Sequence, residues 1–223
     1  MNAALPQRLV AEALGTALLL ATVVGSGIMG ERLAGGNMAI ALLANAIATG
    51  AALYALITTF GPISGAHFNP LVTIVEVIEG QLRGREAALY LSCQIVGALA
   101  GVLAAHTMFE LPLLQISQHA RTGASQWWSE ALATFGLLTV ILHCAKYRSG
   151  SVPAVVACYI TAAYWFTSST SFANPAVTFA RSLTDTFVGI RPTDVHGFIA
   201  AQFTGAALAY WLYRWMEKKV LDK

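Results

Sequence analysis

Apolar residues run along this chain in long blocks that are separated by short clusters of charge. About 20 apolar residues of helix cross the hydrocarbon core of a bilayer. Six intervals of 15 or more residues contain no charged residue, and they lie at 13–30, 33–75, 87–109, 131–145, 149–180 and 195–213. They predict six membrane-crossing helices, near 9–30, 37–60, 85–107, 127–147, 152–168 and 194–216. The intervals 33–75 and 149–180 are too long for one helix each. Segments near 61–79 and 169–184 therefore remain unassigned to a crossing helix.

Composition agrees with a membrane protein. Only 11% of the residues are charged, 57% are hydrophobic, and the mean hydropathy is +0.63. A typical soluble chain has about 25% charged residues. The net charge of +2 excludes the strongly basic surface of a nucleic-acid-binding protein, so we expect no nucleic-acid partner. The three cysteines indicate no disulfide framework and the histidines show no metal-ligand spacing, so we expect no cofactor.

Lysine and arginine are distributed unevenly between the two sides of the predicted bundle. If both termini share one side, that side carries nine basic residues: Arg8, Arg83, Arg85, Lys146, Arg148, Arg214, Lys218, Lys219 and Lys223. The other side carries four: Arg32, Arg121, Arg181 and Arg191. Cytoplasmic loops carry the excess of positive charge, so we predict a plasma (inner) membrane protein with both termini cytoplasmic. We expect the first helix to be retained, because Glu12 interrupts its apolar run.

The first half of the sequence recurs in the second half. Three pairs of segments align in order: VAEALGTALLL (10–20) with WSEALATFGLL (128–138), SGAHFNPLVTI (64–74) with STSFANPAVTF (169–179), and SCQIVGALAG (92–101) with AAQFTGAALA (200–209). Each half contains three crossings, an odd number, so the second copy is inverted in the membrane. Inverted repeats are typical of transporters and channels. We therefore predict a single domain over 1–223, with repeats at approximately 9–107 and 127–216.

Each left-over segment contains an Asn-Pro pair followed by an apolar stretch. Asn69-Pro70 and Asn174-Pro175 occupy equivalent places in the repeats, and Pro suits the first turn of a helix. Roughly eleven residues remain, enough for about 16 Å of helix, which is half of a bilayer. We predict two half-helices whose N-termini meet near the midplane. Extended backbone leading into them is tolerated at that depth where it lines a water-filled path.

At these residues the chain resembles the aquaporin and aquaglyceroporin family, also called major intrinsic proteins. The resemblance rests on two boxes, Asn69-Pro70-Leu71 and Asn174-Pro175-Ala176, and on the lead-in SGAHFNP. It implies an all-α integral membrane fold with six transmembrane helices and two half-helices, a pore in each subunit, and a homotetramer. Leu71 stands where the family usually has Ala.

Polar residues near the boxes suit the passage of neutral solutes. Each box Asn can offer side-chain N–H groups to a passing oxygen, and the two helix N-termini add positive partial charge at the same point. This combination admits neutral dipoles and opposes cations and protons. Glu12 and Glu130, at equivalent repeat positions, are either proton relays or, as we prefer, acceptors for backbone N–H groups of the half-helix loops. His67 either lines the pore wall, as the resemblance implies, or packs as a structural histidine.

The resemblance also places a selectivity filter, where family members use aromatic residues and an arginine. Counting from the second box assigns Ser171 and Val177 to it, with Val177 at the position of the family's arginine. Counting back along ungapped stretches adds Thr49 and Ala162. All four residues are small and uncharged, so we expect a wide filter without a cation.

Arg181 lies one helical turn beyond position 177 and is the one basic residue near the expected filter. It either guards the external vestibule or extends to the membrane surface and pairs with Asp185, four residues further on. We prefer the second interpretation, because long basic side chains commonly reach toward water in this way.

These observations predict a passive channel for small neutral solutes, including water, glycerol and urea. The segment YWFTSSTSFANPAVTFARS resembles bacterial aquaglyceroporins associated with arsenic-resistance loci, which implies permeation by arsenite, antimonite or methylated arsenicals. A water-selective aquaporin is the alternative, which Val177 disfavours. An enzyme would need a nucleophile with a base, or a metal, at midplane depth, and the sequence supplies neither. A structural protein with a closed pore is a further alternative.

Overall fold

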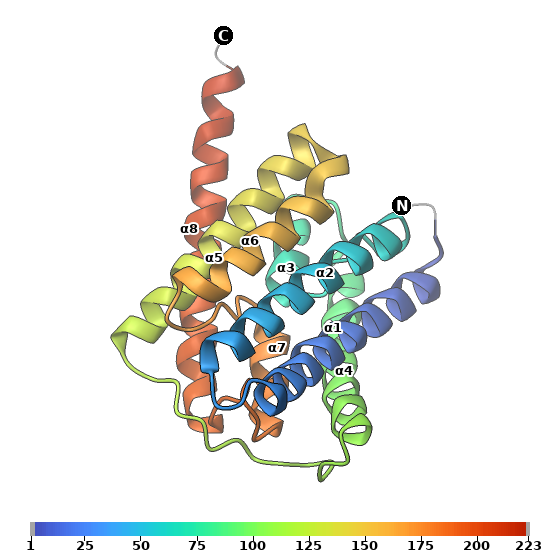
Figure 1. Cartoon of the computed structure of the whole chain (residues 1–223). Helices are drawn as coiled ribbons and strands as arrows, with labels where there is room; N and C mark the ends of the chain where they lie inside the picture. Colours follow the sequence, from blue (N-terminus) through green and yellow to red (C-terminus); the bar gives the residue numbers. More distant parts are fainter. Residues whose placement is uncertain (1–2, 222–223) are drawn as a thin grey trace.

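The computed structural model describes residues 3–221, which are helical along most of their length (Figure 1). Its eight α-helices are α1 (Leu5–Leu33), α2 (Met38–Ser64), α3 (Pro70–Ile78), α4 (Gly84–Met108), α5 (Ala124–Tyr147), α6 (Val152–Phe166), α7 (Pro175–Ala180) and α8 (Pro192–Leu221). Two 3₁₀ turns, η1 (Ser149–Ser151) and η2 (Arg181–Leu183), precede α6 and follow α7. Residues 1, 2, 222 and 223 of the expected domain, and hence Lys223 of the charge count, lie outside the described residues.

Within residues 3–221, six helices are long and two are short, which confirms the predicted all-α fold. Five of them are long and apolar enough to cross a membrane: α1, α2, α4, α5, and α6 together with η1. The sixth, α8, has 30 residues, and His196 and Gln202 make it less apolar. The two short helices, α3 and α7, begin at Pro70 and Pro175 as expected.

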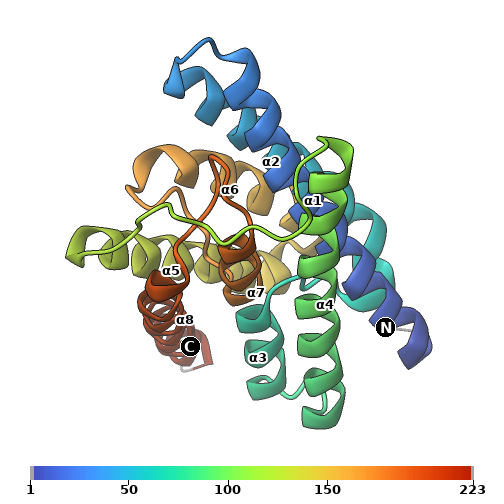
Figure 2. The same cartoon turned by 90° about the horizontal axis from the view of Figure 1, so that it is seen from below.

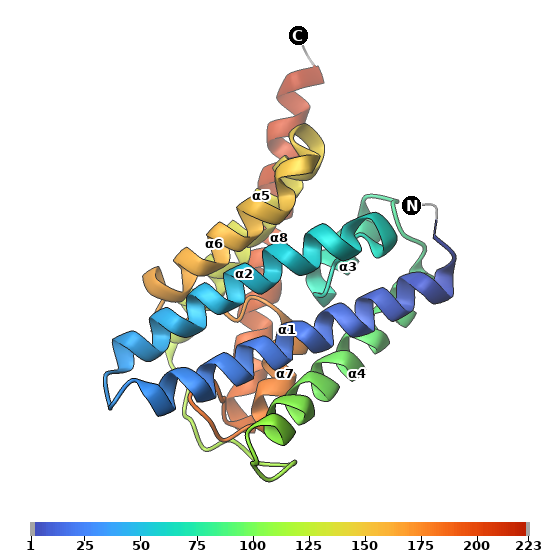
Figure 3. The same ribbon diagram turned by 45° about the vertical axis from the view of Figure 1, so that its right-hand side comes forward.

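The two halves of the chain pack in the same way. In the first half, α1 lies against α2 and α4, and Figure 3 shows these three helices side by side. In the second half, α5 lies against α6 and α8. Glycine allows the closest approach in each half: a Cβ at Gly97 would collide with the carbonyl oxygen of Ala13, and one at Gly205 with that of Ala131. Gly97 and Gly205 are aligned in the repeat, so the inverted halves share one packing device.

The half-helices begin near each other at the centre of the molecule, where α3 and α7 lie between the long helices (Figures 1 and 2). Asn69 caps α3, its side-chain oxygen accepting from the N–H of Leu71, and Asn174 caps α7 by accepting from Ala176 and Val177. The helices have nine and six residues. They are shorter than expected, and α7 ends early because the chain tightens into η2.

Both ends of the described chain lie on one side of the molecule, called here the termini side (Figure 1). The connection between α4 and α5, residues 109–123, crosses the opposite side, called here the loop side, and runs past α7 (Figure 2). The N–H of Ser117 donates to the carbonyl of Ser182 in η2 at 3.0 Å. The connection is therefore attached to the segment that ends the second half-helix.

Candidate functional site

A cavity of about 100 Å³ runs through the centre of the molecule between the two repeats. A water molecule needs about 10–15 Å³ of such space, so several waters fit in file. One wall comes from long helices, with side chains repeating every four residues: Thr49, Leu53 and Ile57 on α2, and Val152, Val156, Ile160 and Tyr164 on α6. From Val152 to Tyr164 this wall covers about 18 Å along α6. It is apolar until its loop-side end.

The opposite wall is made by the two stretches that lead into the half-helices. Its lining residues run from Gly65 to Asn69 and from Ser171 to Asn174. Asn69 Nδ2 donates to the carbonyl of Ala173 at 2.8 Å, and Asn174 Nδ2 donates to the carbonyl of Phe68 at 2.7 Å. These bonds tie the two boxes together and use one N–H of each amide. Because a side-chain amide has two N–H donors, the second one of each box remains for a solute in the cavity.

Glu12 and Glu130 hold these two stretches from behind. Glu12 accepts from the backbone N–H groups of His67 (2.9 Å) and Phe68 (2.8 Å). Glu130 accepts from Phe172 (2.8 Å) and Ala173 (2.9 Å) in the same way. Both carboxylates are fully buried. Both carboxylates thus accept hydrogen bonds from the half-helix loops, as the preferred structural role requires.

A glutamine and a threonine recur beside each carboxylate, and Glu12 also accepts from Ser64 Oγ at 2.7 Å. Gln94 Nε2 donates to Glu12 at 2.8 Å and to Thr73 Oγ1 at 2.9 Å. In the second repeat, Gln202 Nε2 donates to Glu130 at 2.7 Å and to Thr178 Oγ1 at 2.8 Å. The two glutamines are aligned in the repeat, but the alignment by itself indicates no role for them. A buried polar residue recurring in both halves was the available signal.

The stretches need this support because their backbone is strained. Residues three and one positions before each box Asn have positive φ: Ala66 (49°), Phe68 (48°), Ser171 (51°) and Ala173 (47°). Such conformations cost about 1–3 kcal/mol each for residues other than glycine, and they cluster at functional sites. Because the strain occurs at the same two places in both repeats, we take these stretches as the candidate functional segments of the molecule.

His67 lines the termini-side part of the cavity. Its Nδ1 lies 3.0 Å from Thr73 Oγ1, and its ring lies 5.2 Å from that of Tyr90. The His67 ring therefore has features of both interpretations: it packs against Tyr90, as a structural histidine would, and it also lines the cavity.

Three of the four expected filter residues, Thr49, Ser171 and Val177, line the cavity. The assignment of Ala162 is wrong. Ala162 is exposed on the outer face of α6, and Tyr164 lines the cavity instead, with its hydroxyl 3.2 Å from Thr49 Oγ1. A shift of two residues turns a helical side chain by about 200°, so a small error in the length of the loop after α6 selects the opposite face.

The expectation that Arg181 reaches the membrane surface and pairs with Asp185 is also wrong, whereas the absence of a cation from the filter itself stays a prediction. Arg181 is 2% exposed and lines the same cavity as Val177. Its guanidinium lies 3.3 Å from the centroid of the Phe172 ring, and its Nε donates to the carbonyl of Val188. Asp185 instead accepts from the N–H of Gln118 at 2.8 Å. The 3₁₀ turn after Ala180 directs the arginine inward. A regular helix would have continued and placed Arg181 beside Asp185, four residues further on.

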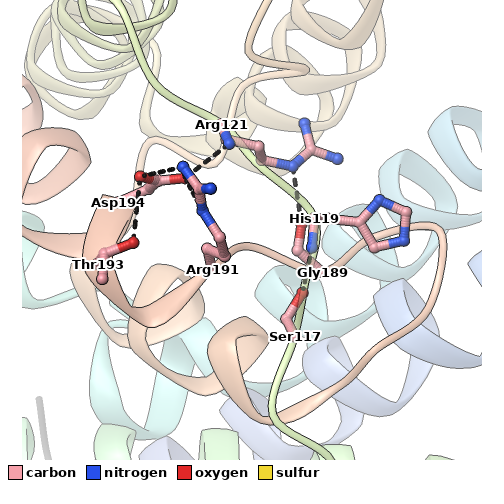
Figure 4. Close-up of polar contacts among 7 residues, drawn as sticks. All are labelled: Ser117, His119, Arg121, Gly189, Arg191, Thr193 and Asp194. Atoms are coloured by element: carbon pink, nitrogen blue, oxygen red, sulfur yellow. Dashed lines mark hydrogen bonds and ion pairs between the residues drawn. The ribbon is translucent and has the colours of Figure 1, made fainter.

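A second arginine attaches the loop-side connection to the same region (Figure 4). Arg121 Nε donates to the carbonyl of Gly189 at 2.7 Å, and its backbone N–H donates to Asp194, which also pairs with Arg191. The guanidinium lies 5.1 Å from the centroid of Phe172. Phe172 thus has both arginines, 121 and 181, over its ring.

This arrangement of inverted repeats, paired half-helices and a central lined cavity agrees with the comparisons to known proteins. The family model described as Major intrinsic protein matches residues 2–213. The chain is 55% identical to Aquaglyceroporin AqpS of Rhizobium meliloti (strain 1021) over 212 residues, which cover 95% of this chain and 91% of the relative. The chain belongs to the major intrinsic protein family.

Other relatives agree with this assignment. Probable aquaporin AqpM of Archaeoglobus fulgidus is 30% identical over 255 residues, covering 98% of this chain and 100% of the relative. The X-ray structure of the aquaglyceroporin from Plasmodium falciparum matches with a TM-score of 0.71 at 19% identity, covering 97% of each chain; this likeness shows the fold. This major intrinsic protein is a multi-pass membrane channel protein with the aquaporin fold.

Proposed function

We propose that this major intrinsic protein is a passive channel of the aquaglyceroporin type for water, glycerol, urea and arsenite. The observation that carries the proposal is the two-sided wall of the cavity. One side is apolar and is formed by Leu53 of α2 and Val152 of α6 together with the apolar residues near them. The other side offers the box amides and backbone groups. A polyol has carbon atoms on one side and hydroxyl groups on the other, so such a wall can pair with it along its whole length.

The relative AqpS, which bears the name aquaglyceroporin, supports the same solute class. Arsenite and antimonite at neutral pH are uncharged trihydroxides, so they present the same hydroxyl groups to the box amides as glycerol does. Methylated arsenicals share these groups in part. Val177, in place of the family's arginine, leaves room beside Thr49 and Ser171 for solutes larger than water.

Stopped-flow permeation in one preparation of proteoliposomes tests the proposal. Water, glycerol, urea and arsenite should each enter faster than into empty vesicles of the same lipid. Glycerol and arsenite rates at the level of empty vesicles would contradict it.

A water-selective channel is the second candidate, and one observation favours it. Tyr164 and Arg181 place an aromatic side chain and a cation on the cavity wall, which is the combination that narrows a filter. The same experiment separates the candidates, because a water-selective channel would pass water and leave glycerol and urea outside.

We further propose that the termini are cytoplasmic and that the channel is a homotetramer in the plasma membrane. The uneven distribution of basic residues supports the orientation, and membership of the family supports the assembly. Labelling of a C-terminal tag only after cells are opened, and crosslinking that proceeds to four subunits, are the expected results. Labelling in intact cells or crosslinking that ends at dimers would contradict these points.

A further inference from the structure

The loop-side end of the cavity holds polar groups that a simple path for neutral solutes does not require. Thr49, Tyr164, Ser171 and Arg181 all line it there. Thr49 and Tyr164 contact each other through their hydroxyl groups at 3.2 Å. The other two have hydrogen-bonding capacity that the protein leaves unused.

Arg181 uses little of its donor capacity. A guanidinium has five N–H donors, and among the described residues only the Nε of Arg181 has a protein acceptor, the carbonyl of Val188. The side chain is 2% exposed, so bulk water does not solvate the remaining donors. The planar group lies on the Phe172 ring, which fixes its orientation. A buried, fixed guanidinium with free N–H groups beside a cavity is suited to bind an oxygen ligand.

Ser171 provides a second, independent observation. Its hydroxyl group is buried and has no hydrogen-bond partner among the described residues, and the residue is 3% exposed on the cavity wall. Leaving a buried hydroxyl unpaired is unfavourable, and most such groups have a partner in protein or water. The partner of Ser171 is therefore expected in the cavity itself. Ser171 also adjoins Phe172, whose ring carries the guanidinium.

The charge at this end is not neutralised by a contacting carboxylate. Within residues 3–221, neither Arg181 nor the side chain of Arg121 forms an ion pair, and the guanidinium of Arg121 donates to carbonyls such as that of Gly189. Two cations over one ring, without a paired anion, oppose the entry of any other cation. The positive charge and the free hydrogen-bonding groups therefore lie at the same end of the cavity.

We propose that Arg181 and Ser171 form an oxygen-binding subsite for small neutral hydroxylated or carbonyl solutes, and that Arg181 is the residue that excludes cations from this channel. Val177 leaves the usual arginine position apolar, and the guanidinium is supplied one turn later. The inference rests on the proposed channel function and specifies how that channel discriminates among solutes.

Urea and guanidinium are the appropriate probes for Arg181, because they have nearly the same planar shape and differ in charge. Wild-type proteoliposomes should admit urea and exclude guanidinium. Arg181→Met should raise the guanidinium-to-urea permeability ratio at least about tenfold, the scale expected when a nearby charge in a low-dielectric wall is removed. Arg181→Lys keeps the charge and should keep the ratio low. Arg191→Met is the matched control, because Arg191 is a loop-side arginine that pairs with Asp194 outside the cavity lining.

Ser171→Ala tests the hydrogen-bonding part without removing charge. It should lower the glycerol-to-water permeability ratio about two- to tenfold, the effect of one lost hydrogen bond. Ser182→Ala is the matched control, since Ser182 is also buried but donates to the carbonyl of Phe179. If the hydroxyl group of Ser171 does not bind solute, its removal leaves the glycerol-to-water permeability ratio unchanged, and this result would contradict the proposal.

The outcomes distinguish this inference from the proposed function. Absence of urea and glycerol flux in the wild-type protein contradicts the proposed function. Normal wild-type flux with unchanged ratios in Arg181→Met and Ser171→Ala overturns the subsite alone. Should Arg181→Met fail to fold, Arg181→Lys and Ser171→Ala decide: guanidinium entry in the lysine variant, or an unchanged glycerol ratio in the alanine variant, overturns the proposal.

Discussion

Glu130→Gln separates a structural carboxylate from a proton relay. Glu130 receives three hydrogen bonds: Phe172 N–H at one oxygen, and Ala173 N–H and Gln202 Nε2 at the other. A glutamine in the same place has one acceptor oxygen and one NH₂ group. At best its oxygen serves two of the three donors, and the third, the buried N–H of Phe172, then faces another donor.

The cost of this substitution follows from those three bonds. One unpaired buried N–H costs about 1–3 kcal/mol, and each of the two remaining bonds loses about 1 kcal/mol when the acceptor is no longer charged. Removing a buried charge recovers part of this, so we expect a net loss of about 3 kcal/mol. For a chain of this size, that corresponds to a fall in Tm of roughly 6–12 °C.

Scanning calorimetry of the protein in detergent measures the fall in Tm. Water permeability of the same preparation in proteoliposomes should fall too, because Glu130 holds the strained stretch at Ser171 and Ala173. Glu31→Gln is the control, since Glu31 is exposed at the end of α1 and should leave Tm unchanged. A Glu130→Gln protein with wild-type Tm and water flux, altered only in proton conductance, would refute the structural role.

Three further predictions concern the path itself. Val177→Arg should lower the glycerol-to-water permeability ratio about tenfold, an effect that 1.4 kcal/mol produces, because a second guanidinium enters the cavity beside Arg181; an unchanged ratio in stopped-flow would mean that position 177 is not at the constriction. Asn174→Asp should suppress water and glycerol flux, because the carboxylate lacks the N–H that donates to Phe68 at 2.7 Å; normal flux in a folded variant would contradict this. Mercurials should inhibit water flux weakly, because the cysteines are not among the residues that line the described cavity. Strong block that a thiol reverses would show that one of them faces the path.

The helical framework could be predicted from the sequence because it depends on local and additive properties. Intervals without charge located the six long helices within a few residues, since a charge in the hydrocarbon core is costly wherever it occurs. The Asn-Pro pairs marked the starts of α3 and α7, because capping and the first-turn preference of Pro involve neighbouring residues alone. The repeat then indicated that Glu12 and Glu130 have equivalent roles.

The set of residues that line the loop-side end of the cavity depended on the shape of the loops, which neither hydrophobicity nor spacing reports. Between α6 and α7 the chain passes through residues with positive φ, so counting back from the second box through this irregular loop does not locate the face of α6 that meets the cavity. Tyr164 therefore lines it where counting selected Ala162. In the same way, Arg181 points inward because it lies in a 3₁₀ turn and contacts Phe172 and Val188. A regular helical pattern does not predict these contacts. A side chain's direction at such places follows from non-local packing and hydrogen bonds, so the tertiary structure was needed to find it.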